Sequence, residues 1–168
     1  MRAVVFPEIG RWEVAEVPEP TIGPGRLLLS VGAAGICGTD LHILAGEFIA
    51  TYPCIPGHEF AGTVLQVGPG VEGFSVGDRV AALSQSSFAE YDVADQAAVV
   101  PLPSELDGLP FAGEPLGCAM NIFRRSGISP GQTVAIVGIG FLGAILTRLA
   151  TDAGARVIAL SRRPYSLD

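Results

Sequence analysis

Short apolar segments separated by glycine- and proline-rich turns dominate the first 110 residues. Four of these segments have the length and composition of β-strands: residues 3–6, 26–33, 62–67 and 79–83. Turn signals such as Gly23-Pro24-Gly25 and Gly77-Asp78 stand between them. Many short strands with close turns predict an all-β domain over residues 1–110, folded as a partly open barrel.

The pattern changes after this region. Residues 112–127 predict a helix that ends at Gly127, and the chain then reads as strand 133–137, helix 141–153 and strand 156–160. Gly154 is a plausible stop for the second helix. Strand, helix and strand make a βαβ unit, which is the start of an α/β Rossmann domain.

Three regions are therefore expected: a barrel domain at 1–110, a connecting helix at 111–128 and a partial Rossmann domain at 129–168. A complete doubly wound dinucleotide domain has about six strands, and only about two are present here. We therefore expect this chain to be a fragment or a shortened form of a longer protein.

Composition excludes several classes of protein. No apolar run approaches the ~20 residues that a transmembrane helix needs, and the N-terminus lacks the charged and apolar regions of a signal peptide. The three cysteines are odd in number and widely spaced, which argues against a disulfide framework. A reducing, cytoplasmic setting and no association with membranes are expected.

Charge is distributed unevenly along the chain. Residues 1–114 hold 15 acidic residues and four arginines, whereas residues 115–168 hold two acidic residues and six arginines. The acidic first part argues against nucleic acid as a partner. The basic second part suits a phosphate-rich cofactor, although a solvated helix face explains most of these arginines equally well.

Cys37 and the adjacent pair His58 and Glu59 offer a thiolate, an imidazole and a carboxylate. Zn²⁺ prefers these ligand types, and a catalytic zinc keeps a further position open for substrate. A lone cysteine is more often a small buried apolar residue. The prediction of a metal site therefore rests on the three residues together and not on Cys37 alone. Asp40 is expected to orient the ligands.

A glycine motif follows the first strand of the βαβ unit. Its residues are Gly138, Ile139, Gly140, Phe141, Leu142 and Gly143. In a dinucleotide-binding turn the first glycine makes the tight turn, the second lets the backbone approach the pyrophosphate, and the third lets the helix pack closely. The helix N-terminus, with Phe141 and Leu142, presents free N–H groups to the phosphates. The motif alone is a weak signal, but the strand before it and the helix after it support a dinucleotide-binding turn.

Several spaced motifs, taken in order, resemble those of one family. Besides the glycine motif they are residues 35–42, 55–62, 77–80, 88–91 and 114–116. Together they resemble the zinc-dependent medium-chain dehydrogenase/reductase family, the alcohol and polyol dehydrogenases. The resemblance implies a GroES-like catalytic domain for the barrel. It also implies an NAD(P)-dependent oxidoreductase that interconverts an alcohol or polyol and its carbonyl compound.

The resemblance also implies roles for individual residues. Glu114 occupies the place of another ligand or near-ligand, so either Glu59 or Glu114 could bind the metal directly; a helix start that favours an acid is the alternative. Thr39 stands at the hydroxyl relay of the family, and His42 stands where some members pass the proton to solvent. A turn hydroxyl and an exposed helix residue are the respective alternatives.

The residues after the second Rossmann strand discriminate between the two cofactors. NAD enzymes usually carry Asp or Glu there to bind the ribose 2′-hydroxyl. This chain has Ser161, Arg162 and Arg163 instead, which could bind a 2′-phosphate. NADP is therefore expected in preference to NAD, with solvated loop arginines as the alternative.

One feature departs from many family members. Residues 81–87 replace a four-cysteine structural zinc lobe and contain no Cys or His, so one catalytic zinc is expected and no structural zinc. This short connection resembles the zinc-free quinone and enoyl reductases, which are one alternative. A catalytically incomplete fragment is another. The implied substrate is a small-molecule alcohol or carbonyl compound, and the full-length form is expected to be a homo-oligomer.

Overall fold

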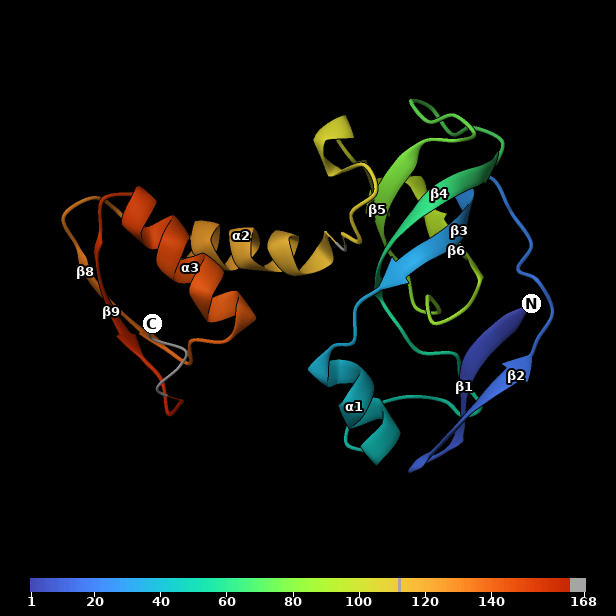
Figure 1. The fold of residues 1–168 in the computed structure, drawn as a ribbon, viewed down its shortest axis with the longest axis horizontal. Coiled ribbons are helices and arrows are strands. Elements are labelled where there is room, and N and C mark those ends of the chain that lie inside the picture. The colour runs from blue at the N-terminus through green and yellow to red at the C-terminus, as the bar shows by residue number, and fades with distance from the viewer. Residues whose placement is uncertain (112, 164–168) are drawn as a thin grey trace. The chain divides into compact units, whose positions relative to one another are not determined.

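The computed structural model of the chain describes residues 1–111 and 113–163. They divide into two compact units, Met1–Glu114 and Pro115–Asp168. The first unit is mostly β, and the second pairs two helices with a small parallel sheet (Figure 1).

A five-stranded antiparallel sheet forms the body of the first unit. Its strands are β3 (Arg26–Ala34), β4 (Glu59–Val67), β5 (Arg79–Leu83), β6 (Tyr91–Asp95) and β7 (Val99–Pro101). Their order is β6-β3-β4-β5-β7, so the curled sheet keeps two open edges. The predicted partly open, mainly β barrel is confirmed.

The core of this unit follows the two-residue period of its strands. Leu27 and Leu29 of β3 are fully buried, as are Phe60 and Val64 of β4 and Val80 of β5. Residues two or four apart lie on one face of a strand, so these side chains of β3 and β4 reach the core from one face of the sheet. Burial of each large apolar side chain stabilises the fold by about 1.5–3 kcal/mol.

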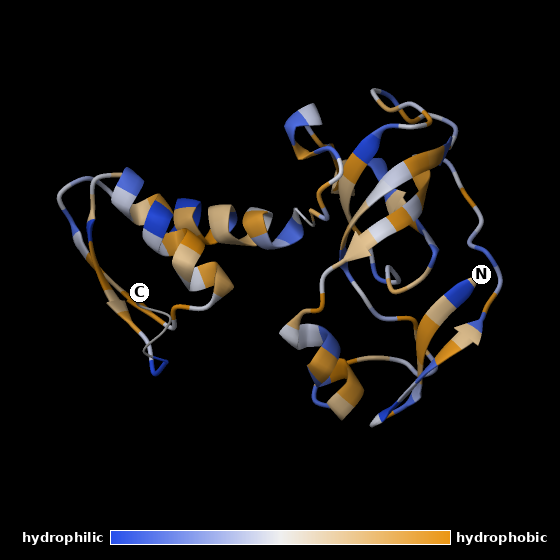
Figure 2. Ribbon diagram, in the orientation of Figure 1, coloured by the Kyte–Doolittle hydropathy of each residue, from blue (hydrophilic) through white to orange (hydrophobic). Residues whose placement is uncertain are grey.

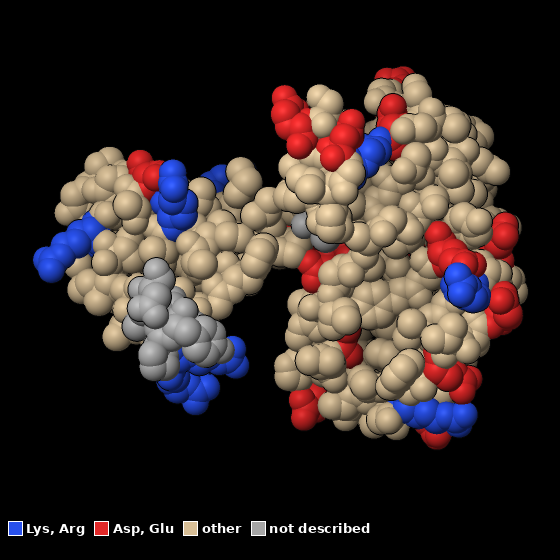
Figure 3. Space-filling model, viewed as in Figure 1, with Lys and Arg blue, Asp and Glu red and all other residues tan. Residues whose placement is uncertain are grey.

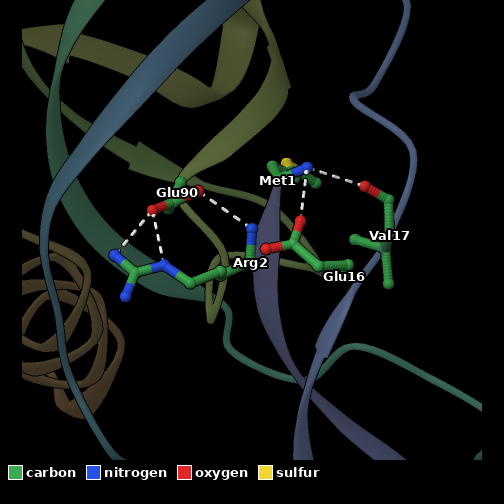
Figure 4. A network of polar contacts seen from close by, with 5 residues as sticks. All are labelled: Met1, Arg2, Glu16, Val17 and Glu90. Carbon is green, nitrogen blue, oxygen red and sulfur yellow. Dashed lines mark hydrogen bonds and ion pairs between the residues drawn. The ribbon is translucent and has the colours of Figure 1, made fainter.

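An N-terminal hairpin packs beside this sheet through few but specific contacts. Its strands β1 (Arg2–Glu8) and β2 (Arg11–Glu16) pair antiparallel, and single bridges join Ala3 to Ala89 and Phe6 to Cys54. Figure 4 shows the polar network at its start. The Arg2 backbone N–H and guanidinium donate to Glu90 at 2.8–2.9 Å.

Replacing Glu90 with glutamine is expected to lower stability near neutral pH but to have little effect in acid. Hydrogen bonds from the backbone and side chain of Arg2 lower the pKa of Glu90 from its ordinary value of about 4.5. The pair therefore stabilises the fold above that value, and its contribution is lost as the pH falls through the lowered pKa. The effect should be small because water reaches both side chains, with Arg2 70% and Glu90 41% exposed.

Thermal unfolding of the two proteins at about pH 7 and about pH 3 measures this difference. A difference of equal size at both pH values would contradict the role given to the Arg2–Glu90 pair.

A short helix interrupts the β pattern of the first unit. Helix α1 (Gly38–Ala45) begins after Cys37 at the end of β3, and an irregular segment then returns the chain to β4. The strand pattern of the sequence did not predict this helix. Two 3₁₀ turns, Gln96–Ala98 and Ser104–Leu106, flank β7.

The second unit contains the predicted βαβ arrangement. Its elements are α2 (Glu114–Ser126), β8 (Thr133–Val137), α3 (Phe141–Asp152) and β9 (Arg156–Leu160). Helix α2 starts at Glu114, the last residue of the first unit, and position 112 of the predicted helix lies outside the described residues. Strands β8 and β9 are parallel and mostly hydrophobic (Figure 2). Gly154, with φ of 82°, follows the end of α3 as expected.

The charge asymmetry of the sequence is visible on the surface. Figure 3 shows several separate acidic patches on the first unit, and basic side chains on the second unit. Within the described residues, none of the helices is long and apolar enough to cross a membrane.

Candidate functional site

The ends of strands β3 and β4 bring three predicted ligands together. One ligand atom each from Cys37, His58 and Glu59 lies within 4.8 Å of the others. Pairing between these strands continues beyond their ladder, because the Gly35 N–H donates to the Glu59 carbonyl at 2.9 Å. In the part of the chain that the structure describes, this is the one cluster of three or more such side chains.

Gly35 leaves the space that the Glu59 side chain occupies. A Cβ built on Gly35 would lie 2.7 Å from Glu59 Cδ and 2.9 Å from Cγ. A larger residue at this position would make the Glu59 side chain shift. The glycine two positions before the cysteine therefore bears on where this ligand lies.

Asp40 holds both segments of this group in place. Asp40 is 2 % exposed, and its carboxylate accepts hydrogen bonds from the N–H of Cys37 at 2.8 Å and of Gly57 at 3.3 Å. Its Oδ1 lies 3.5 Å from His58 Nδ1. An imidazole whose Nδ1 faces a carboxylate offers Nε2 to a metal, which is the usual arrangement around zinc.

Negative charge is concentrated around Glu59. Burial raises the pKa of this carboxyl group, and the neighbouring charge of Glu114 raises that pKa further. Asp40 acts in the same direction, and His58 opposes it. Buried carboxylates that repel one another are stabilised by a cation. A thiol, an imidazole and a carboxylate around such a point suit Zn²⁺.

The predicted relay residues both belong to α1. Thr39 is half-buried, and its Oγ1 lies 3.6 Å from Cys37 Sγ. His42 is exposed, and its Nδ1 lies 2.7 Å from Glu47 Oε2. The structure thus places Thr39 beside the ligand group and His42 at the surface.

A short loop is hydrogen-bonded to the backbone of the segment that carries His58. The N–H groups of Ser84, Ser87 and Phe88 donate to the carbonyls of residues 58, 57 and 56 at 3.0–3.3 Å. Ser84 and Ser87 belong to the short connection at residues 81–87, and Phe88 follows it. A Cβ at Gly57 would lie 2.4 Å from the Phe88 ring, so the approach of the two segments requires glycine there.

The glycine motif forms the expected turn between β8 and α3. A Cβ on Gly143 would lie 2.1 Å from the Gly138 carbonyl oxygen, so helix and turn approach too closely for any side chain. Gly140 is the extended residue before the helix, and the exposed side chains of Phe141 and Leu142 follow it in the first turn.

Ser161, Arg162 and Arg163 lie at the same end of the parallel strands as this turn. The parallel register pairs Val137 with Leu160, so Gly138 and Ser161 follow adjacent strand ends. The Arg163 N–H donates to Ser161 Oγ at 3.1 Å, and Arg162 and Arg163 are both exposed.

Two contributions to the site, those of Gly35 and Glu47, were not predicted from the sequence. Gly35 lies in a quoted motif, but its space for Glu59 depends on the pairing of β3 with β4. The contact of Glu47 with His42 depends on a helix that was not predicted. The spacing of five residues between them was the one available signal.

Comparison with known proteins shows which family the chain resembles. Residues 23–104 match the family model of the alcohol dehydrogenase GroES-like domain. A sorbitol dehydrogenase of Halalkalibacterium halodurans is 31% identical over 89% of this chain and 52% of its own length. The chain belongs to the alcohol dehydrogenase family.

Solved structures of other oxidoreductases share the fold of this alcohol dehydrogenase family member. A protein of Sinorhizobium meliloti, described as a zinc-binding dehydrogenase bound to NADP, is 34% identical with a TM-score of 0.87, covering 98% of this chain and 57% of that one. A quinone oxidoreductase of Pseudomonas syringae is 25% identical with a TM-score of 0.87, covering 98% and 54%. The chain spans about half the length of the curated relatives it matches.

Proposed function

We propose that this chain provides the zinc-binding catalytic domain and the start of the cofactor domain of an NAD(P)-dependent alcohol or polyol dehydrogenase. The observation that carries the proposal is the group of Cys37, His58 and Glu59 with ligand atoms within 4.8 Å. Several curated relatives are named as alcohol or polyol dehydrogenases, which supports the reaction class.

Each residue of the ligand group has a defined part in this proposal. Cys37, His58 and Glu59 hold the metal, Asp40 fixes the imidazole, and Glu114 is the neighbouring carboxylate. Bound zinc would supply a Lewis acid that lowers the pKa of a substrate hydroxyl. No second metal is needed for this chemistry.

Oxidation of an alcohol releases a hydride and a proton, and different parts of the protein receive them. A bound nicotinamide cofactor would accept the hydride, and Gly138, Gly140, Gly143 and the N-terminus of α3 would hold its pyrophosphate. The proton passes from the substrate hydroxyl to Thr39 and is released through His42 to solvent. The reverse sequence reduces a carbonyl compound.

The first experiment is metal analysis of the purified chain. We expect about one zinc per chain, because the described residues offer one ligand group. Turnover is then assayed with a panel of alcohols, polyols and carbonyl compounds in a longer protein that includes the remaining length of the relatives. One zinc with no turnover of any member of the panel would reject the dehydrogenase but not the metal site.

A zinc-free quinone or enoyl reductase is the second candidate. The short loop after β5 favours it, as does the similarity to a quinone oxidoreductase. The group of a thiol, an imidazole and a buried carboxylate favours the zinc enzyme, since reduction of a quinone does not need it. Absence of zinc after growth with added zinc, together with quinone reduction, would establish the second candidate instead.

Removal of either arginine after β9 is expected to weaken NADP binding far more than NAD binding. Arg162 and Arg163 are exposed beside the position where a 2′-phosphate would sit, and residues 161–163 contain no carboxylate to repel it. Loss of one charge-assisted hydrogen bond costs about 1.5–3 kcal/mol. Calorimetric titration of a longer protein with each cofactor measures the preference.

Arg148→Ala is the matched control, because Arg148 is an exposed arginine of the same unit that pairs with Asp152 at 2.7 Å. It should change neither affinity. Ser161→Asp should shift the preference toward NAD by adding an acceptor for the ribose. Equal weakening of both cofactors by Arg162→Ala would show that the arginines do not select NADP.

A further inference from the structure

We propose that Glu47 is a positioning residue that keeps His42 in one tautomer, with the proton on Nδ1 and the lone pair on Nε2. The proposal rests on the proposed function, in which His42 releases the proton. It begins from one contact: Glu47 Oε2 lies 2.7 Å from His42 Nδ1.

The backbone at the end of α1 places Glu47 opposite His42. Gly46 follows the helix with φ of 75°, a left-handed conformation that glycine adopts without strain. The N–H of Gly46 donates to the Ile43 carbonyl at 3.0 Å, and the N–H of Glu47 donates to the His42 carbonyl at 2.8 Å. This is a helix-ending motif that satisfies carbonyls of the last turn. His42 and Glu47 are therefore joined through both main chain and side chain.

Neighbouring segments fix the same helix end. The Gly10 N–H donates to the Leu44 carbonyl at 2.7 Å, and the Tyr52 hydroxyl donates to the Ile43 carbonyl. The carbonyls of residues 42, 43 and 44 thus each have a partner from outside the helix. Glu47 is held in register with His42 by contacts that do not depend on the carboxylate itself.

The chemistry of the two groups decides the tautomer. A neutral imidazole carries one proton, and an ionised carboxylate can only accept a hydrogen bond. The proton must therefore lie on Nδ1, which leaves Nε2 as the acceptor. Both side chains are more than half exposed, at 60% and 65%, so water reaches the pair and can take the proton onward.

Nuclear magnetic resonance of the imidazole nitrogens tests the proposal on this chain without turnover. The chain has two histidines, and His42→Gln identifies the signals of each. At alkaline pH, where imidazole is neutral, we expect His42 to carry its proton mainly on Nδ1. In Glu47→Ala this tautomer should become the minor one, while His58 is unchanged. Glu72→Ala, which removes an exposed carboxylate from a loop of the same unit, is the control and should have no effect.

Turnover of a longer protein provides the second arm. Glu47→Ala should lose less than the ~100-fold or more that removal of a proton-transfer group costs. The double variant with His42→Ala should lose no more than His42→Ala alone, because Glu47 acts through the imidazole. Additive losses, or an unchanged His42 tautomer in Glu47→Ala, would overturn the positioning role. If Glu47→Ala changed the tautomer of His42 without any loss of turnover, the relay role of His42 would be overturned. The proposed metal site would not be affected by that result.

Discussion

A chain that carries Cys37→Ser is expected to lose nearly all of its zinc, whereas the unmodified chain should hold about one zinc per molecule. The hydroxyl of serine does not ionise near neutral pH, so it cannot replace a thiolate as a ligand. The loss of affinity should exceed the ~10–100-fold that removal of an orienting neighbour costs. Elemental analysis after dialysis against a weak chelator measures it.

Cys54→Ser is the matched control for this experiment. The backbone of Cys54 pairs with Phe6 through two hydrogen bonds, and the serine would keep both. Burial raises the pKa of the Cys54 thiol, which is the opposite of what a metal-binding thiolate requires. This variant should retain its zinc. Loss of zinc from both variants, or from neither, would contradict the ligand role of Cys37.

Thr39→Val should reduce the turnover of a longer protein by about 10²–10⁴-fold. Valine keeps the shape of threonine and removes the hydroxyl that lies 3.6 Å from Cys37 Sγ. Zinc content and cofactor affinity should stay unchanged, because neither depends on that hydroxyl. Steady-state kinetics combined with metal analysis separates the loss of proton transfer from loss of the site.

Thr21→Val, at an exposed position before β3, makes the same chemical change away from the ligand group and should leave turnover intact. Near-normal turnover of Thr39→Val would mean that the proton leaves by another route. Loss of zinc in Thr39→Val would instead mean that the hydroxyl supports Cys37 rather than the reaction.

The regular elements were predictable because their signals are local. Alternating apolar residues and glycine turns predicted β3 and β5 within one residue, and the spacing of Gly138, Gly140 and Gly143 predicted the turn before α3. Strand β4 begins at Glu59, three residues earlier than expected. Its extension reflects pairing with β3, which no local pattern reveals.

The site was predicted from ligand chemistry and family resemblance rather than from geometry. The ligand chemistry of Cys37, His58 and Glu59 identified them as candidates. Their proximity depends on the register of β3 and β4, which the sequence alone does not give. A helix was considered only as the alternative for His42 and α1 was not predicted as an element, because it has only eight residues and its N-cap is a cysteine instead of a common capping residue. The pairing of Glu47 with His42 was therefore not predicted either.

The positions of the ligands along the chain have a consequence for the integrity of the protein. Cys37 and His58 bound a stretch of 20 residues, 38–57, which leaves the sheet after β3 and rejoins it at β4. A metal bound by Cys37 and His58 would hold the two ends of this segment together. It would stabilise the folded segment, because the unfolded chain would not bind the metal comparably. Loss of zinc would then let residues 38–57 unfold locally before the rest of the protein unfolds. Metal starvation should be recognisable as proteolytic nicking between residues 38 and 57 while the barrel remains intact.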